Sequence, residues 1–407
     1  MKLASRLERI EPFYVMEMAK AAQARAASPA CDPALGGQPM IYMNIGEPDF
    51  TATAAVQHAA SACMARGQTQ YTAATGLIAL RRAISRWYAQ RWKVEVDPSR
   101  IVITAGASAA LQLISLALFE SGDEVLMPDP CYPCNRHFVS ATGATATLLP
   151  TTVQQRFTLS AAQVAARWQP HTRGVLLASP SNPTGTSIHP QDLAAVHQVV
   201  RDHGGVLLVD EIYLGLCYDS RYARSALQLG EDIISINSFS KYFGMTGWRL
   251  GWLVLPPDLV APVEKLAQNF YICPSSLAQH AALACFEDPC LHEYERRRGE
   301  LERRRDLAVQ GLSEAGLPVP VVPDGAFYVW AQSNAWGPDS FEVCLQLIEH
   351  AHVVLTPGRD FGPTHARDFI RLSYATDEAL LRQAVDRLRD VRNRGILATG
   401  AAERLNA

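Results

Sequence analysis

The sequence is poor in lysine and lacks long hydrophobic runs. Of its 37 basic residues only five are lysine, so a lysine in an apolar setting stands out. No stretch of about 18 apolar residues predicts a membrane-spanning helix, and the start, MKLASRLERIEPF, lacks the apolar region of a secretory signal. The net charge is −3, without a basic block. Charge gives no reason to expect nucleic acid or an anionic membrane as a partner, and we expect a cytoplasmic protein.

A regular cysteine framework is also missing. The nine cysteines are scattered, and the C-x-x-C of Cys131 and Cys134 has neither a second pair nor histidines at ligand spacing. We expect free cysteines of a reducing compartment and no metal site. The rest of the composition, 48% hydrophobic and 19% charged, is ordinary for a globular protein. The length suffices for one large domain and a smaller one.

Short β-branched runs alternate with helical patterns from about residue 100 onwards. The helical pattern is clearest in ASAALQLISLALFE, where apolar residues recur at three- and four-residue spacing. This alternation predicts an α/β fold with a largely parallel sheet, and the continuously apolar runs predict strands covered on both faces. The predicted strands are 101–104, 124–128, 175–178, 206–210, 232–237 and 248–255.

The chain changes character after Asp288. A long charged helical stretch at 291–316 precedes the strand-like runs AFYVWA, HVVLTPG and DFIRLSYA and a last helix. The segment 21–38 looks like a mobile loop. The predicted division is 1–50, an N-terminal arm and part of a small domain; 51–289, a large domain; and 290–407, a smaller α+β domain.

Polar and charged side chains follow the predicted strands. In open α/β sheets, ligands bind at the carboxyl ends of the strands, so these side chains are expected to meet at one edge. They comprise the start of a helix, an aromatic ring, an amide, a carboxylate, a phenol, two hydroxyls, an amine and an arginine that returns on the next strand. The residues are Gly106, Ala107, Ser108, Tyr132, Asn182, Asp210, Tyr213, Ser238, Ser240, Lys241 and Arg249.

Together these side chains favour a phosphorylated, protonatable aromatic ring that reacts with an amine. A helix N-terminus and an arginine suit a phosphate, and Tyr132 can stack on a ring. Asp210 would keep a pyridine nitrogen protonated, which makes the ring an electron sink. Asn182 and Tyr213 can donate to a ring phenolate. In an apolar pocket beside a second cation, Lys241 would have a lowered pKa and serve as a neutral amine.

Several stretches match motifs of one known family. SFSKYFGMTGWRLG has the pattern S-x-S-K-x-x-x-x-x-G-x-R-x-G, SPSNPTG contains an Asn-Pro motif, and DEIY has Asp-x-x-Tyr. With NIGEPDF, YTAATGLIALR and FIRLSYA, they resemble the fold-type I, pyridoxal phosphate-dependent aminotransferases of class I/II, the aspartate aminotransferase superfamily. The resemblance covers about residues 40 to 375. It implies a mostly parallel seven-stranded sheet between helices, pyridoxal 5′-phosphate bound as a Schiff base to Lys241, and a homodimer.

The resemblance implies further roles at matching positions. The backbone of Gly46 would lie beside the substrate carboxylate, with Asn182 close by, and Arg371 would bind that carboxylate. Tyr71 would reach the phosphate of the partner subunit's cofactor. The Asn182-Pro183 peptide bond is expected to be cis. The phosphate loop lacks the longer polar side chains of some members, so only backbone contacts and the Ser108 hydroxyl are assigned there.

The function implied is transfer of an amino group from an L-amino acid to a 2-oxo acid. Lys241 would move the α-proton, and Asp210 and Tyr213 would assist through the ring. Because a fold does not decide chemistry, two alternatives stay open on this scaffold: another reaction of the same cofactor, such as a carbon–sulfur β-lyase or a cyclopropane-forming synthase, and aspartate aminotransfer.

A donor with a neutral or apolar side chain is favoured over a dicarboxylate. A second carboxylate in a partly desolvated pocket needs a dedicated cation, and the stretch from Ile101 to Pro133 contains no lysine or arginine. Arg136, Arg359 and arginines of a partner subunit could overturn this expectation if one of them reaches the pocket. The apolar and amphipathic residues expected near the entrance are Phe13, Tyr14, Met16, Met18, Phe270 and Tyr271.

Overall fold

The computed structural model describes residues 3–12 and 14–397. Its centre is a seven-stranded sheet of order β2-β8-β7-β6-β5-β3-β4, in which β8 runs opposite to the other six strands. The predicted α/β fold with a seven-stranded, mostly parallel sheet is therefore confirmed. The strands are β2 Ile101–Thr104, β3 Glu124–Asp129, β4 Thr145–Pro150, β5 Thr172–Ala178, β6 Val206–Asp210, β7 Ile234–Ser238 and β8 Gly251–Val254.

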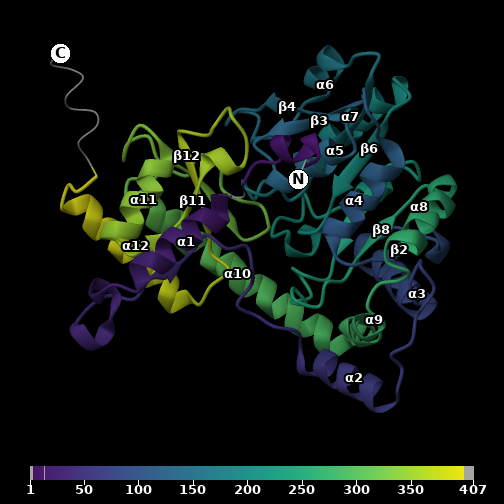
Figure 1. The fold of residues 1–407 in the computed structure, drawn as a ribbon, viewed down its shortest axis with the longest axis horizontal. Coiled ribbons are helices and arrows are strands. Elements are labelled where there is room, and N and C mark those ends of the chain that lie inside the picture. Colours follow the sequence, from purple (N-terminus) through teal and green to yellow (C-terminus); the bar gives the residue numbers. More distant parts are fainter. Residues whose placement is uncertain (1–2, 13, 398–407) are drawn as a thin grey trace.

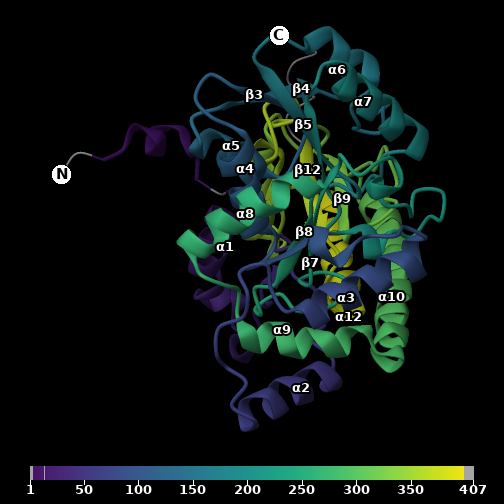
Figure 2. The same cartoon turned by 90° about the vertical axis from the view of Figure 1, so that its right-hand side faces the viewer.

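The strands are apolar throughout because both faces of the sheet are covered. Successive residues of one strand enter different hydrophobic cores: Ile101 and Ile103 belong to one, and Val102 to the other. Helices lie on either side of the sheet (Figures 1 and 2). The helices of this part of the chain are α2 Ala54–Ala65, which packs on α9 and not on the sheet, α3 Ile78–Trp87, α4 Ala107–Leu118, α5 Pro133–Ala141, α6 Ala161–Arg167, α7 Pro190–Asp202, α8 Pro257–Phe270 and α9 Ser276–Ala282.

A second, smaller lobe lies beside the sheet (Figure 1). It contains an antiparallel sheet of order β11-β12-β9 and a parallel pair, β1 with β10. The long helix α10 begins at Asp288, next to the boundary that we propose between the large and small domains. The elements are α1 Tyr14–Ala26, β1 Ile41–Tyr42, α10 Asp288–Glu314, β9 Tyr328–Gln332, α11 Ser340–His350, β10 Val353–Val354, β11 Thr356–Pro357, β12 Phe369–Ser373 and α12 Glu378–Asn393.

Three local predictions need correction. The segment 21–38 is not a loop throughout, because its first residues complete α1, whose sequence YVMEMAKAAQARA is rich in helix formers. The strand predicted from residue 248 starts at Gly251, since a turn with Arg249 at φ 51° precedes it. Strand β4 was missed because TATLLP lies at the sheet edge, is mostly part-exposed and has no continuous apolar run.

Two elements of the N-terminal arm contact elements of the smaller lobe. Helix α1 packs against α11, and β1 pairs with β10. Within residues 3–12 and 14–397, no helix is both long and apolar enough to cross a membrane.

Candidate active site

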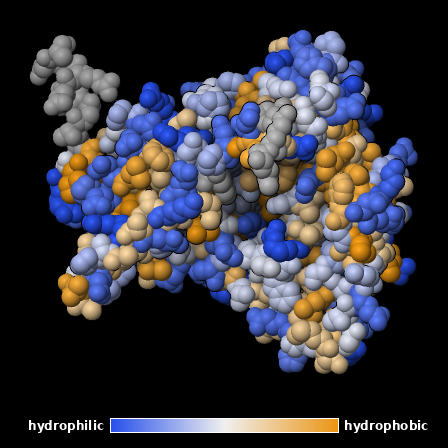
Figure 3. Space-filling model, in the orientation of Figure 1, coloured by the Kyte–Doolittle hydropathy of each residue, from blue (hydrophilic) through white to orange (hydrophobic). Residues whose placement is uncertain are grey.

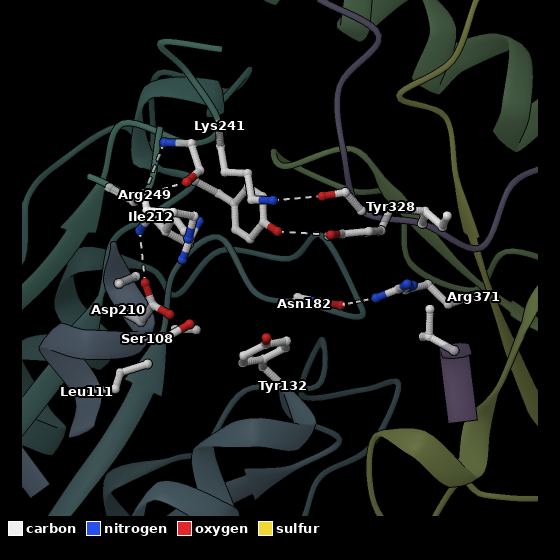
Figure 4. A pocket seen from close by; sticks show the side chains of 18 of the residues that line it. Ser108, Leu111, Tyr132, Asn182, Asp210, Ile212, Lys241, Arg249, Tyr328 and Arg371 are labelled. Carbon is white, nitrogen blue, oxygen red and sulfur yellow. Dashed lines mark hydrogen bonds between the residues drawn. The ribbon is translucent and has the colours of Figure 1, made fainter. Parts of the chain in front are cut away.

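A cavity of about 320 Å³ opens at the carboxyl edge of the large sheet and extends to the smaller lobe (Figure 4). Two of the candidate residues, Gly106 and Tyr71, are not part of its lining. The other predicted residues line it: Gly46, Ala107, Ser108, Tyr132, Asn182, Asp210, Tyr213, Ser238, Ser240, Lys241, Arg249 and Arg371. In Figure 4, Asp210 and Arg371 lie on opposite sides of the cavity, and Lys241 lies across it from Tyr132.

Lys241 follows β7 and reaches into the cavity. Its Nζ donates a hydrogen bond to the carbonyl oxygen of Gly46 at 2.7 Å. Enclosure by the surrounding protein lowers the pKa of Lys241 to about 8; Glu47 opposes this change and the positive charge of Arg249 adds to it. A substantial fraction of the amine is therefore neutral near physiological pH, as a nucleophile or a base requires.

Asp210 is the last residue of β6 and is 6% exposed. Its Oδ1 accepts a hydrogen bond from the backbone N–H of Ile212 at 3.0 Å. No cationic side chain among the described residues forms an ion pair with it. Burial raises the pKa of Asp210 to about 7, and the neighbouring carboxylate of Glu211 acts in the same direction. A cation placed opposite Asp210 would relieve this cost.

Donors for an anion gather where α4 begins. The hydroxyls of Ser238 and Ser240 are 2.9 Å apart, and the exposed guanidinium of Arg249 donates to the Thr246 carbonyl oxygen at 3.0 Å. Because β8 is antiparallel, the residues before it lie at the same edge as the ends of the parallel strands. Gly106 has φ 86°, and a Cβ there would lie 2.5 Å from Nη2 of Arg249. Glycine thus lets the arginine approach the N-terminus of α4, and the group suits a phosphate.

Arg371 lies in β12 and is 3% exposed. Its Nη1 donates to Oδ1 of Asn182 at 2.8 Å, and its Nη2 donates to the carbonyl oxygen of Asn44 at 2.6 Å. The guanidinium carbon is 4.3 Å from the ring centre of Tyr328 and 4.8 Å from that of Phe361. These contacts fix the orientation of a planar fork that can bind a carboxylate. The Asn182-Pro183 bond is cis, as expected.

Tyr328 is the main cavity residue that the sequence did not reveal. Its hydroxyl is 2.9 Å from that of Tyr213, and a Cβ at Gly46 would lie 1.9 Å from it. The run AFYVWA predicted a strand, but nothing in it indicated which aromatic ring faces a ligand. Other lining residues outside the prediction are Val15, Ile45, Leu111, Ala178 and Ile212.

The expected entrance residues are only partly at the cavity. Met16 lines it, whereas Met18 is 1% exposed and belongs to the hydrophobic core. Phe270 and Tyr271, at the end of α8, do not line it, and Phe13 lies outside the described residues. The described residues contain no cluster of three or more His, Cys, Asp or Glu that could hold a metal ion.

Comparison with known proteins identifies the family. The model of the family described as aminotransferase class I and II matches residues 38–388. The chain belongs to this family. The family is pyridoxal phosphate-dependent, and its members act on amino acids and oxo acids.

Curated and solved relatives of this aminotransferase are similar over nearly the whole chain. The valine–pyruvate aminotransferase of Mycobacterium tuberculosis is 37% identical over 93% of this chain and 96% of its own. A crystal structure of an aminotransferase from the same species has a TM-score of 0.91 at 36% identity, covering 97% and 100% of the two chains. Thermus thermophilus aspartate aminotransferase, solved with maleate, has a TM-score of 0.88 at 30% identity, covering 96% and 100%.

Proposed function

We propose that this aminotransferase holds pyridoxal 5′-phosphate through a Schiff base to Lys241. The observation that carries the proposal is that one cavity contains both the amine of Lys241 and the buried carboxyl of Asp210, which forms no ion pair with a described cation. Burial lowers the pKa of the amine and raises that of the carboxyl, in agreement with this arrangement. A protonated pyridine nitrogen opposite Asp210 would supply the positive charge that this carboxyl lacks. The residues present therefore fit the cofactor of the family.

The other cavity residues fit the remaining parts of the cofactor. The phosphate would be bound by the backbone of Gly106 to Ser108, with hydroxyls from Ser108, Ser238 and Ser240 and the guanidinium of Arg249. Tyr132 would stack on the ring, and Asn182 and Tyr213 would donate to the ring oxygen. Hydrogen bonding between Tyr213 and Tyr328 supports this orientation of the phenol.

When bound, the cofactor withdraws electrons from the α-carbon of the amino acid. Arg371, fixed by Asn182 and Asn44, orients the α-carboxylate. The Nζ of Lys241 would take the α-proton and later return it, which is general acid–base catalysis by an amine of suitable pKa. The amino group is thereby moved from an L-amino acid to a 2-oxo acid.

The test is to replace Lys241 with alanine and to use exposed Lys265, on α8, as the matched control. Lys241→Ala should lose both transamination and a borohydride-reducible adduct with the cofactor, whereas Lys265→Ala should keep both. A reducible lysine adduct in Lys241→Ala would refute the assignment. Incubation of the wild-type enzyme with cystathionine separates the lyase alternative: release of pyruvate and a thiol without an oxo-acid acceptor would favour it.

We further propose that the preferred donor has a neutral or apolar side chain. Val15, Met16 and Ile45 make part of the cavity wall apolar. Arg136 and Arg359 do not line the cavity: Arg136 pairs with Glu11 at 2.9 Å, and Arg359 pairs with Asp339 of the smaller lobe. A relative named for valine and pyruvate supports the same class.

The specificity ratio tests this proposal. The values of kcat/KM for alanine, valine, methionine, leucine and phenylalanine should exceed those for aspartate and glutamate with a common acceptor. A strong preference for aspartate over every neutral donor would show that a cation reaches the side-chain pocket, either from this chain or from a partner subunit.

We also propose a homodimer in which each subunit contributes Tyr71 to the active site of the other, and exposed side chains support this proposal. Tyr71 is 79% exposed and lies outside the cavity of its own chain, as a residue that acts in a partner subunit would. Other large apolar side chains are exposed as well, among them Ile78, Phe270 and Ile272. On the face drawn in Figure 3, hydrophobic side chains gather over the side that carries α8 in Figure 1. Such a surface favours association with a second copy.

A further inference from the structure

Asp129, the last residue of β3, joins the large sheet to the smaller lobe. It is 1% exposed. Its Oδ2 accepts two hydrogen bonds from Thr364, one from the backbone N–H at 3.0 Å and one from the hydroxyl at 2.6 Å. Its Oδ1 faces Gly362, where φ is 148° and a Cβ would lie 2.0 Å away. Glycine at this position is therefore required for the close approach of the carboxylate.

The segment that is hydrogen-bonded to Asp129 packs against Arg371. Residues 358–368 connect β11 to β12, the strand that carries this arginine. The ring centre of Phe361 is 4.8 Å from the Arg371 guanidinium. The carbonyl oxygen of Phe361 in turn accepts a hydrogen bond from the backbone N–H of Cys131 at 2.9 Å. Cys131 directly precedes Tyr132, the residue expected to stack on the cofactor.

Asp129 thus contacts, directly or through one neighbour, the segments that carry Tyr132 in the large lobe and Arg371 in the smaller lobe. Asp129 lies three residues before Tyr132 in the chain, and it is hydrogen-bonded to the loop whose Phe361 packs on Arg371. We propose that Asp129 is a positioning residue that sets where Arg371 stands relative to Tyr132, and so aligns the substrate carboxylate with the cofactor ring. The inference rests on the roles proposed above for Tyr132 and Arg371.

The test compares L-valine with isobutylamine, which lacks the α-carboxylate. The measured quantity is the second-order rate constant with which each amine changes the absorption band of the bound cofactor. The ratio of the rate constant for L-valine to that for isobutylamine reports how well the α-carboxylate is aligned, because only L-valine carries it. Asp129→Ala should lower the ratio about tenfold, the order of one hydrogen bond to a charged group. Thr364→Val should lower it less, because the backbone donor stays. Asp129→Asn, which keeps an acceptor for Thr364, should recover most of it.

Arg371→Lys serves as the reference for the ratio. If Arg371→Lys lowers the ratio and neither Asp129→Ala nor Thr364→Val does, the positioning role is overturned while the proposed function stands. An equal loss toward both amines in these two variants would also overturn it, because a purely structural defect acts that way. Thr364 is exposed, so its variant remains informative if Asp129→Ala does not fold. An unchanged ratio in Arg371→Lys would instead overturn the role proposed for Arg371 and this inference with it.

Discussion

Asp210→Asn should separate the stability of this enzyme from its activity. The asparagine keeps the shape of the side chain and an oxygen that can accept the hydrogen bond from Ile212, now 3.0 Å long. It removes the charge that burial disfavours, and it also removes the partner proposed for the pyridine nitrogen. We therefore expect the variant to be more stable than the wild type when both are freed of cofactor, and far less active when both are loaded.

The stability change follows from the pKa of Asp210. The ordinary value of 3.8 applies to the unfolded chain, and burial raises the folded value to about 7. Between these two pKa values the folded state holds the proton more tightly, so the free energy of unfolding falls as pH rises through this window. Each unit of pKa shift corresponds to about 1.36 kcal/mol, so above pH 7 the buried charge of Asp210 lowers the free energy of unfolding by about 4 kcal/mol. Below the lower pKa this destabilisation vanishes. The free energy of unfolding of Asp210→Asn should exceed that of the wild type by up to this amount.

Urea unfolding of the two cofactor-free proteins between pH 4 and 8 measures this difference. The stability advantage of Asp210→Asn should be largest at pH 8 and shrink steadily toward pH 4. Once loaded, the variant should transaminate about 100- to 1000-fold more slowly, the usual cost of removing one preorganised electrostatic partner. Equal stabilities at pH 8, or full activity in the loaded variant, would refute the reasoning that Asp210 is a buried charge matched to the cofactor.

Three further outcomes are expected. As the pH rises toward 8, the rate at which the cofactor-free enzyme captures the cofactor should increase about tenfold per pH unit, and above pH 8 it should level off, because burial lowers the pKa of Lys241 to about 8. A stopped-flow rate profile that rises only near pH 10 would contradict this. Gly106→Ala should weaken cofactor binding measured by equilibrium dialysis, since its Cβ would lie 2.5 Å from Arg249, and unchanged affinity would count against the phosphate site. Hybrid dimers of Tyr71→Phe and Lys241→Ala chains should regain part of the activity, because one site would carry neither defect; no recovery in proven hybrids would mean that Tyr71 acts within its own chain.

The sequence by itself determined the fold class and most of the candidate site. Continuously apolar strands are a local signal, because a strand covered on both faces must be apolar at every position. All six strands predicted for the large sheet lie within three residues of their observed bounds. The candidate residues lie at or shortly after the ends of these strands, and parallel strands end at the same edge of a sheet, so Asp210, Asn182 and Lys241 were expected at one edge. In combination, the sequence motifs between about residues 40 and 375 resemble the family whose model matches residues 38–388.

Only the tertiary structure decided what depends on contacts between distant segments. Tyr328 reaches Tyr213 from a strand more than a hundred residues away, and no local pattern distinguishes it from the aromatic residues beside it. The pairing of Arg136 with Glu11, which leaves it out of the cavity wall, and the hydrogen bonds from Thr364 to Asp129 likewise join separate parts of the chain. Periodicity reports which face of an element is buried, whereas the partner that covers that face is set by the packing of the whole chain.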